Sequence, residues 1–316
     1  MPSSAQRVTC HSKTNKEPVM TFETVAIIAQ GDMGAGTGAQ LVRNGLRVVT
    51  NLSGRSERSH MLAKQAGLED VGEDNALIRE ADIFLSILPP GQAVALGQQM
   101  APHIKSSGKN LIYADCNAIA PATAQEVQAI VEPAGARFVD VGIFGNPPTP
   151  EKNGTRYYAS GPDAAEFGRL RNQGLTVIEC GAEIGRASAI KMCFASVTKT
   201  MIAMMAETVV AAKALGVYDE VVHELSGNQT DGFNWAAKRV ISTPPKAYRW
   251  VAEVEEIGKT FETVGLPGAT CTGGAEMFQL IADSPLGEET VENRQRGTTL
   301  EDCAAIAADY IGGLKP

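Results

Sequence analysis

A short glycine-rich stretch near the N-terminus has the composition of a phosphate-binding turn. Its small residues fit the spacing of a dinucleotide fingerprint in two registers, Ala29/Gly31/Gly34 and Gly34/Gly36/Ala39. Only the first register begins where the strand-like run TVAIIA ends, as such a fingerprint requires. The helix that follows would present unpaired backbone N–H groups to phosphate oxygens. The alternative is a glycine-rich helix start that binds no ligand.

The segment after the second strand-like run lacks the acidic residue that an NAD enzyme carries there. Its sequence, TNLSGRS, holds no carboxylate before Glu57. A carboxylate would bond the ribose 2′-hydroxyl of NAD and would repel the 2′-phosphate of NADP. Arg55, with the hydroxyls of Ser53 and Ser56, suits a phosphate through charge-assisted hydrogen bonds. We therefore expect NADP(H), and the alternative is a polar loop in which Ser56 only caps the next helix.

One lysine lies in a long apolar segment without an acidic neighbour. Residues 187–216 have no proline, no internal glycine and only four charged residues, so they predict one largely buried helix of about 45 Å. Lys191 has Ala187 and Ala195 four residues to either side, and therefore no acid on its own face. Such a lysine suits proton transfer to a carbonyl oxygen, or from an alcohol in reverse. The alternative is a solvated lysine on an exposed stripe shared with Lys199.

The segments around these residues alternate between strands and helices. Strand patterns lie at residues 24–29, 46–52, 83–89, 110–116, 137–144, 156–160 and 175–181. Helical patterns near residues 57–66 and 93–100 intervene, which predicts a doubly wound, mostly parallel α/β sheet of the Rossmann type. After it, helices alone are predicted. We expect a disordered tail at residues 1–20, an NADP-binding Rossmann domain at residues 21–183 and an all-helical substrate and dimerisation domain at residues 184–316.

Composition excludes several classes of protein. The 316 residues carry a formal net charge of -8 and a pI near 5.2, with no basic run, which argues against a nucleic-acid partner. The six cysteines and four histidines show no metal-ligand spacing, so no metal is expected. We predict no membrane-spanning segment and no secretory signal, and hence a cytoplasmic protein that acts on a small-molecule substrate.

Five motifs in order carry a family resemblance. They are GDMG (residues 31–34), SILPP (86–90), DCNAIAP (115–121), FVDVGIFGNPP (138–148) and GAEIGRASAIKMCF (181–194). With them the chain resembles the β-hydroxyacid dehydrogenase family, relatives of 6-phosphogluconate dehydrogenase that include 3-hydroxyisobutyrate dehydrogenases and, more distantly, imine reductases. The resemblance covers nearly the whole chain after Met20, and it implies that Lys191 is the catalytic lysine.

The resemblance and the residues together give a candidate cofactor site and a candidate substrate site. The cofactor site comprises Ala29, Gly31, Asp32, Met33, Gly34, Asn51, Ser53, Arg55, Ser56, Leu88, Pro89 and Asn117. The substrate site comprises Asn117, Phe144, Gly145, Asn146, Lys191, Asp231 and Trp235, with Phe233 and Asn234 as further candidates. The aromatic residues of the last group have an alternative role as core residues.

Some positions depart from the family pattern. The family usually has asparagines shortly after the lysine, a serine and two glycines in the substrate loop, and a Lys-Asp-Leu sequence in the helical domain. This chain has Phe194 and Ala195, then Phe144, Gly145 and Asn146, then Glu255, Glu256 and Ile257. Contacts to a small hydroxy acid are thus altered, and the pattern is similar to a divergent branch whose C-terminal part is a domain of unknown function.

Three functions remain open from the sequence. The first is an NADP-dependent dehydrogenase or reductase of a small hydroxy acid or the corresponding oxo compound. The second is reduction of a C=N bond, which the lost carboxylate contacts favour and Lys191 opposes. The third is an NADP-binding sensor, which has no need of a lysine in an apolar helix. The long apolar helix and the resemblance both imply a homodimer.

Overall fold

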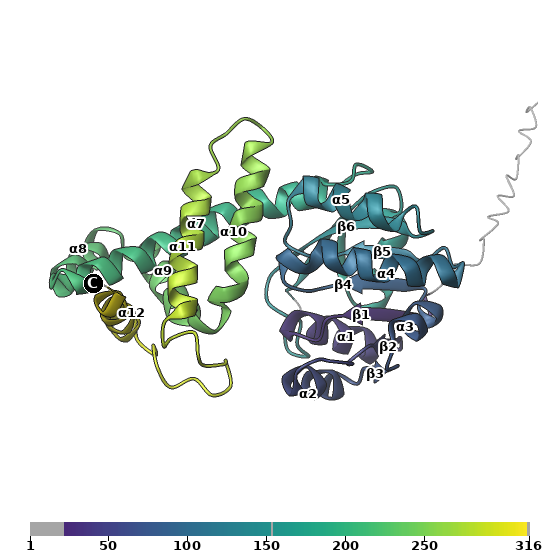
Figure 1. The fold of residues 1–316 in the computed structure, drawn as a ribbon, viewed down its shortest axis with the longest axis horizontal. Coiled ribbons are helices and arrows are strands. Elements are labelled where there is room, and N and C mark those ends of the chain that lie inside the picture. The colour runs from purple at the N-terminus through teal and green to yellow at the C-terminus, as the bar shows by residue number, and fades with distance from the viewer. Residues whose placement is uncertain (1–21, 153, 315–316) are drawn as a thin grey trace, which may run out of the picture.

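The computed structural model describes residues 22–314 except residue 153, and the predicted disordered tail lies outside these residues. Figure 1 shows two parts, an α/β part built on a twisted sheet and an all-helical part beside it. The predicted fold class, a mostly parallel sheet domain followed by a helical domain, is confirmed.

One sheet of eight strands, counted over the described residues, forms the centre of the first part. Its order is β3-β2-β1-β4-β5-β6-β7-β8, and neighbours are parallel apart from the antiparallel pair β6 and β7. The strands are β1 (Thr24–Ile28), β2 (Arg47–Thr50), β3 (Glu69–Asp70), β4 (Ile83–Ser86), β5 (Ile112–Asp115), β6 (Arg137–Phe144), β7 (Arg156–Ser160) and β8 (Thr176–Glu179). The order reverses between β1 and β4, and a doubly wound sheet binds its ligand at the carboxyl ends of the strands beside such a reversal.

Helices cover both faces of this sheet. They are α1 (Asp32–Arg43), α2 (Glu57–Ala66), α3 (Asp74–Glu80), α4 (Ala93–Ser107), α5 (Pro121–Val131) and α6 (Ala164–Phe167), with 3-10 turns η1 (Pro90–Gln92) and η2 (Gly168–Gln173). One apolar core includes Leu41 of α1, and a second core includes Met100 of α4 and Val127 of α5. Because both faces are covered, β1, β4 and β5 are buried along their whole length, which explains their continuous apolar sequences.

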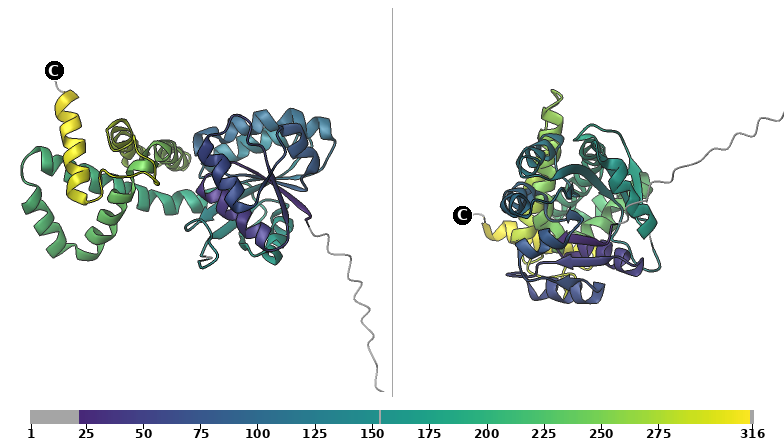
Figure 2. Two further views of the ribbon diagram at one scale, coloured as in Figure 1. Left: turned by 90° about the horizontal axis from the view of Figure 1, so that it is seen from below. Right: turned by 90° about the vertical axis from the view of Figure 1, so that its right-hand side faces the viewer.

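The helical part is built around one long helix. Its elements are α7 (Arg186–Ala214), α8 (Tyr218–Asn228), α9 (Thr230–Ser242), η3 (Pro244–Lys246), α10 (Ala247–Glu262), α11 (Ala269–Asp283) and α12 (Leu300–Leu314). In the left view of Figure 2, α7 runs out of the sheet domain into the helical domain. A third apolar core, after the two of the sheet domain, joins α7 to α9, α10, α11 and α12. The predicted boundary at residues 183 and 184 falls between β8 and α7 and stays a prediction.

The long helix corrects one expectation about membranes. By length and composition alone, α7 is apolar enough to cross a membrane, so the expectation that no segment meets this measure is wrong. The core helix of a helical domain meets the same measure, because neighbouring helices take the place of lipid. The contacts of α7 with six other helices and with β6 fit this second explanation.

Candidate active site

The glycine turn after β1 has the geometry that the first register requires. Gly31 stands at the N-cap of α1 with no side-chain cap, and a Cβ added to it would meet no atom within 4 Å. A Cβ on Gly34 would lie 1.9 Å from the carbonyl oxygen of Ala29, so only glycine allows this close packing. Asp32 and Met33 open the helix. The N-terminus of α1 is therefore uncapped by a side chain and uncrowded at Gly31, as a phosphate-binding turn requires.

The loop after β2 arranges its polar groups around the start of α2. Ser56 is the N-cap of α2 and accepts from the backbone N of Ser59. Asn51 donates to Asp74 at 2.7 Å, and Ser53 donates to the carbonyl of Gly72 at 2.6 Å. Arg55 is half-buried, and within residues 22–152 and 154–314 it forms no ion pair. Ser56 thus has the capping role of the alternative interpretation, while Arg55 is available to an anion.

A second arginine at this place was missed by the sequence analysis. Arg58, in the first turn of α2, has its Nη2 atom 2.6 Å from Asp32 and 2.7 Å from Glu292. Asp32 begins α1, so the guanidinium lies between the N-termini of two helices. We call this region, between α1 and α2, the Arg58 end of the site. In the sequence, only the short distance of Arg58 from Arg55 could have pointed to it. Its two partners, Asp32 and Glu292, are 26 and 234 residues away along the chain.

Asn117 is fixed in place beside the end of β4. Its side-chain amide donates to Ser86 at 2.8 Å and to Asp115 at 3.0 Å, while its oxygen accepts from the backbone N of Leu88 at 2.7 Å. Both amide hydrogens are therefore engaged within the protein, and the side chain is buried. This arrangement positions the turn that carries Leu88 and Pro89. Direct substrate binding through the Asn117 amide would need a rearrangement of these bonds.

Two carboxyl groups lie buried next to each other on β5 and β6. Asp115 and Asp140 are register partners on these strands. Burial raises the pKa of Asp115 to about 7, against the hydrogen bonds from Asn117, and the charge of Asp140 adds to the increase. Burial also raises the pKa of Asp140, although hydrogen bonds from Ser188 oppose it. Asp115 accepts from Asn117, and Asp140 accepts from Ser188, one helical turn before Lys191.

Asp140 fastens the first turn of α7 to the sheet. One of its oxygens accepts from the backbone N of Gly185, the backbone N of Ser188 and the hydroxyl of Ser160, each at 3.0 Å. The other accepts from the hydroxyl of Ser188 at 2.6 Å, and Ser160 in turn accepts from the N of Ala187. Because these donors surround the start of α7, the carboxylate fixes where the helix begins and where its second turn points.

Lys191 lies in that second turn, against the end of β6. Its Nζ donates to the carbonyl of Ile143 at 2.9 Å and stands 5.2 Å from the centre of the Phe144 ring. A Cβ on Gly142 would come within 3.1 Å of the Lys191 Cβ, so this glycine lets α7 approach the strand. Among the described residues no carboxylate pairs with Lys191. We call the edge formed by β4, β5 and β6 with Lys191 the Lys191 end.

The alternative of an exposed lysine stripe is wrong for Lys199. Its side chain is 13% exposed, its Nζ lies 3.2 Å from Glu253 of α10, and it stands 3.7 Å from the centre of the Trp250 ring. Burial lowers the pKa of Lys199, and the carboxylate of Glu253 opposes this effect. The helix presents apolar side chains to solvent instead, with Phe194, Val197 and Met204 each more than half exposed. The expectation of a largely buried helix therefore does not hold for one face of this chain.

The predicted substrate loop lies over the start of α1. Gly145 has a φ of 101°, and Asn146 is exposed, with its carbonyl accepting from the hydroxyl of Thr155. A Cβ on Gly36 of α1 would lie 3.1 Å from the Cβ of Pro147, so the loop packs on this helix. The ring of Phe144 is 5.2 Å from that of Phe194. The loop thus joins the glycine turn to the surroundings of Lys191, and an aromatic pair flanks the lysine.

The predicted residues on α9 are not brought to this site in the single chain. The helix begins at the end of the helical domain away from the sheet (Figure 1). Asp231 is exposed near its start, as is Asn234, while Phe233 is buried in the core. Trp235 stacks with Arg239 at 3.8 Å. The substrate contacts of Asp231 and Trp235 stay a prediction.

One buried carboxylate joins the two domains at the Lys191 end. Glu256 of α10 accepts from the backbone N of Ala120 at 2.8 Å and from the hydroxyl of Thr123 at 2.6 Å. Ala120 is the N-cap of α5, so this carboxylate stabilises a helix start in the other domain. Nearby, Gly91 of η1 packs on Ala252 of α10. The sequence marked Glu256 only as a departure from the family pattern.

Two family models match the chain. Residues 24–173 match the NAD binding domain of 6-phosphogluconate dehydrogenase, and residues 212–281 match a domain of unknown function, DUF1932. Among curated relatives, 3-hydroxyisobutyrate dehydrogenase of Pseudomonas aeruginosa is 28% identical over 221 residues, which is 67% of this chain and 71% of that protein.

Solved structures agree with these matches. A conserved protein of unknown function, described as structurally similar to 3-hydroxyacid dehydrogenases, is 30% identical with a TM-score of 0.58, and the match covers 82% of this chain and 97% of that one. A reductive aminase from Aspergillus terreus, in complex with NADPH and ethyl levulinate, shares the fold at 15% identity and a TM-score of 0.50, over 94% of this chain and 100% of that one. The chain therefore belongs to the 6-phosphogluconate dehydrogenase-like superfamily of hydroxyacid dehydrogenases, in the branch whose C-terminal part carries the DUF1932 domain.

Proposed function

We propose that this protein is an NADP(H)-dependent oxidoreductase that interconverts a small hydroxy acid and the corresponding oxo compound, with Lys191 as the general acid and base. The observation that carries the proposal is the place of the Lys191 amine. It projects from α7 beside the carboxyl end of β6, at 2.9 Å from the Ile143 carbonyl, at the same edge as the glycine turn. Such a site combines a sheet edge that can bind a nucleotide with a lysine that, among the described residues, forms no ion pair.

The cofactor site is assigned from the chain's own groups. The N–H groups of the α1 N-terminus beside Gly31 and Gly34 would hold the pyrophosphate, and Arg55 with Ser53 would hold the 2′-phosphate. The absence of a carboxylate between Thr50 and Glu57 supports NADP(H) over NAD(H). When bound, the nicotinamide cofactor supplies or accepts the hydride.

The proton step belongs to Lys191. Its ammonium group donates a proton to the substrate oxygen as the carbonyl is reduced, and its amine accepts the hydroxyl proton in the reverse direction. The Ile143 carbonyl orients the Nζ atom, and the ring of Phe144 shields one side of it from water. Both contacts come from the end of β6, so the strand fixes the direction from which the proton arrives.

Lys191 can be tested with cofactor binding as a separate readout. In Lys191→Ala and Lys191→Met we expect kcat to fall by about a hundredfold or more while the affinity for NADPH, followed by its fluorescence, stays unchanged. Undiminished turnover in either variant would remove Lys191 from the mechanism. A tenfold or greater preference for NADH over NADPH in kcat/KM would contradict the cofactor assignment. A chain that binds NADPH but turns over no substrate would support a sensor instead.

Reduction of a C=N bond is the second candidate. Phe144 and Phe194 stand beside Lys191 where the resembling family has small or polar residues, which favours a less polar substrate. NADPH oxidation should be measured against matched panels of 2-oxo acids, 3-oxo acids and cyclic imines. Faster turnover of the imines than of every oxo acid would replace the first proposal with the second.

We further propose that the protein is a homodimer. The exposed apolar side chains of α7, with Phe194 at 53%, Val197 at 60% and Met204 at 58%, are too extensive for a helix that faces water alone. A second copy could cover them along the helix. Light scattering coupled to size exclusion should give twice the chain mass, and Val197→Glu should shift it toward the monomer.

A further inference from the structure

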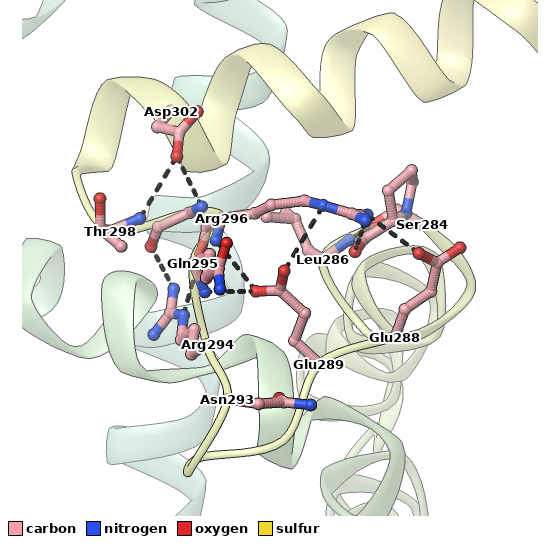
Figure 3. Close-up of polar contacts among 12 residues, drawn as sticks. Ser284, Leu286, Glu288, Glu289, Asn293, Arg294, Gln295, Arg296, Thr298 and Asp302 are labelled. Carbon is pink, nitrogen blue, oxygen red and sulfur yellow. Dashed lines mark hydrogen bonds and ion pairs between the residues drawn. The ribbon is translucent and has the colours of Figure 1, made fainter.

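The segment between α11 and α12, residues 284–299, is a braced loop. Glu289 accepts from the backbone N of Gln295 and of Arg296, while Arg296 pairs with Glu288 at 2.9 Å (Figure 3). Asp302 of α12 accepts from the backbone N of Gly297 and of Thr298. These bonds hold the two ends of the loop together without any regular secondary structure. The loop therefore has a defined shape, and its middle projects from the helical domain.

The middle of this loop contacts the other domain through Glu292. Glu292 accepts from Arg58 Nε at 2.9 Å and from Arg58 Nη2 at 2.7 Å. In Figure 1 the loop extends toward the part of the sheet domain that holds α1 and α2. The side chains are 32% exposed for Arg58 and 45% for Glu292. Hydrogen bonding by Arg58 lowers the pKa of Glu292 to about 2, so the pair stays charged at neutral pH.

Arg58 lies where an adenosine ribose would be held. Asp32 is the first residue of α1, whose N-terminus faces the pyrophosphate in the proposed cofactor site, and Arg58 is in the first turn of α2, beside Ser56. In a dinucleotide-binding fold the pyrophosphate lies at the first helix N-terminus, and the residue that recognises the ribose 2′-position lies about twenty residues further along the chain. The guanidinium is therefore within reach of a 2′-phosphate. In this structure two carboxylates, from Asp32 and Glu292, are its partners.

We propose that Glu292 is a built-in competitor for Arg58, and that the 2′-phosphate of NADP(H) displaces it. Arg58 is then a specificity-determining residue for the cofactor, and Glu292 connects cofactor choice to the position of the 284–299 loop. The proposal rests on the NADP(H) assignment of the proposed function. Under this proposal, Glu292 of the helical domain takes part in recognition of the 2′-phosphate, which would otherwise involve the sheet domain alone.

The exchange is favoured by charge and by exposure. A phosphate monoester carries close to two negative charges and offers three acceptor oxygens, whereas Glu292 offers one charge. Because both members of the pair are partly exposed, breaking it loses little. Asp32 keeps its bond to Arg58 and holds the guanidinium in place, while Arg55 supplies a second positive charge for the phosphate. NAD, which has a hydroxyl at this position, offers no replacement for the carboxylate.

Binding of nucleotide fragments to the intact chain tests this without any substrate. The affinity of 2′,5′-ADP and of 5′-ADP should be measured by calorimetry for the wild type, Glu292→Gln and Arg58→Gln. We expect Glu292→Gln to bind 2′,5′-ADP about threefold to fivefold more tightly, the factor that corresponds to one partly exposed ion pair. Arg58→Gln should bind it about tenfold more weakly. Neither change should alter the affinity of 5′-ADP by more than about twofold.

The matched control is Glu288→Gln, because Glu288 lies in the same loop and, among the described residues, pairs only with Arg296 of that loop. This variant should leave the affinity of both fragments unchanged. A Glu292→Gln variant that binds 2′,5′-ADP no more tightly than the wild type overturns the competition. A wild type that binds the two fragments equally overturns the NADP(H) assignment and this proposal with it, so the two failures are distinguishable.

Hydrogen exchange gives a second readout that does not depend on affinity. Saturating 2′,5′-ADP should increase amide exchange in residues 286–297 of the wild type, because the loop loses its contact with α2. Saturating 5′-ADP should not. In Glu292→Gln this difference between the two nucleotides should disappear. Equal protection of the loop by both fragments in the wild type would contradict displacement.

Discussion

The two ends of the interdomain site are fastened in different ways. At the Lys191 end, Glu256 reaches across to Ala120 and Thr123 as a buried carboxylate. Asp140 holds the start of α7 through three hydrogen bonds and accepts a fourth from Ser160 of β7. At the Arg58 end, the contact between domains is an ion pair whose members are 32% and 45% exposed. Buried donors that lose their acceptor find no water, whereas exposed charges are readily solvated.

This difference separates two tasks. A lysine that transfers protons, as proposed for Lys191, needs a fixed direction, and the bonds around it are of the kind that are costly to break. Nucleotide entry and release need a contact that exchanges, and an exposed ion pair exchanges at little cost. The domains are therefore held rigidly where chemistry is proposed and loosely where the cofactor's distinguishing group would bind. The following variants test that difference, beginning with the largest expected effect.

Removing Asp140 should do the most damage at the Lys191 end. Asp140→Ala leaves the hydroxyls of Ser160 and Ser188 and two backbone N–H groups without their acceptor inside the protein. We expect the free energy of unfolding to fall by about 4 kcal/mol, measured by urea denaturation. Asp309→Ala, at an exposed position on α12, is the control and should change it by less than about 0.5 kcal/mol. Equal effects of the two substitutions would refute the anchoring role.

The buried carboxyl of Asp115 should make stability depend on pH. Its pKa is raised to about 7, so the folded state favours the protonated form, and this contribution to stability is lost as pH rises from about 4 to about 7. Asp115→Asn does not titrate. Its unfolding free energy relative to the wild type should therefore rise by about 2.5 kcal/mol between pH 5 and pH 7. A difference that stays flat over this range would show that Asp115 is not perturbed.

The carboxylate that joins the domains should have an intermediate effect. Glu256→Ala removes the acceptor for the buried N of Ala120 and for the hydroxyl of Thr123, and we expect a loss of about 2 kcal/mol in the free energy of unfolding. Its neighbour Glu255 is exposed on the same helix, so Glu255→Ala is the matched control and should be close to neutral. If both variants unfold at the same denaturant concentration, the bond between domains contributes nothing.

The ion pair at the Arg58 end should matter least for stability. We expect Glu292→Gln to change the free energy of unfolding by less than about 1 kcal/mol at low salt, and by less still at 1 M salt, where screening is strong. Paired denaturation curves at the two salt concentrations give this comparison. A loss larger than that of Glu256→Ala, or one that salt does not reduce, would reverse the contrast between the two ends.

Local patterns in the sequence predicted much of the fold. The register that begins at Ala29 is the one whose glycines fit, because strand end, turn and helix start are neighbours along the chain. The long helix predicted over residues 187–216 begins and ends close to the bounds of α7 for the same reason. What the sequence analysis missed depends on long-range contacts. Gly142 lies far from Lys191 in sequence, and nothing in a lone glycine of a strand indicates which helix it admits.

The unsuccessful expectations have physical reasons of the same kind. Lys199 repeats on the face of Lys191, which is compatible with an exposed stripe, but a glutamate and a tryptophan from α10 cover it. The substrate contacts of Asp231 and Trp235 stay a prediction, and α9, which carries both residues, starts at the far end of the helical domain. Composition cannot tell which helices meet, since one apolar face packs equally well on several partners.

The anchored start of α7 also determines how the molecule can open. Lys191 is one turn beyond the bonds of Asp140, while the 284–299 loop is carried by helices packed along the rest of α7. A rigid rotation of the helical domain about that first turn would swing the loop tip through a long arc and barely displace the lysine. Lys191 therefore lies close to the point where α7 is anchored to the sheet domain, and the Arg58 contact lies far from it.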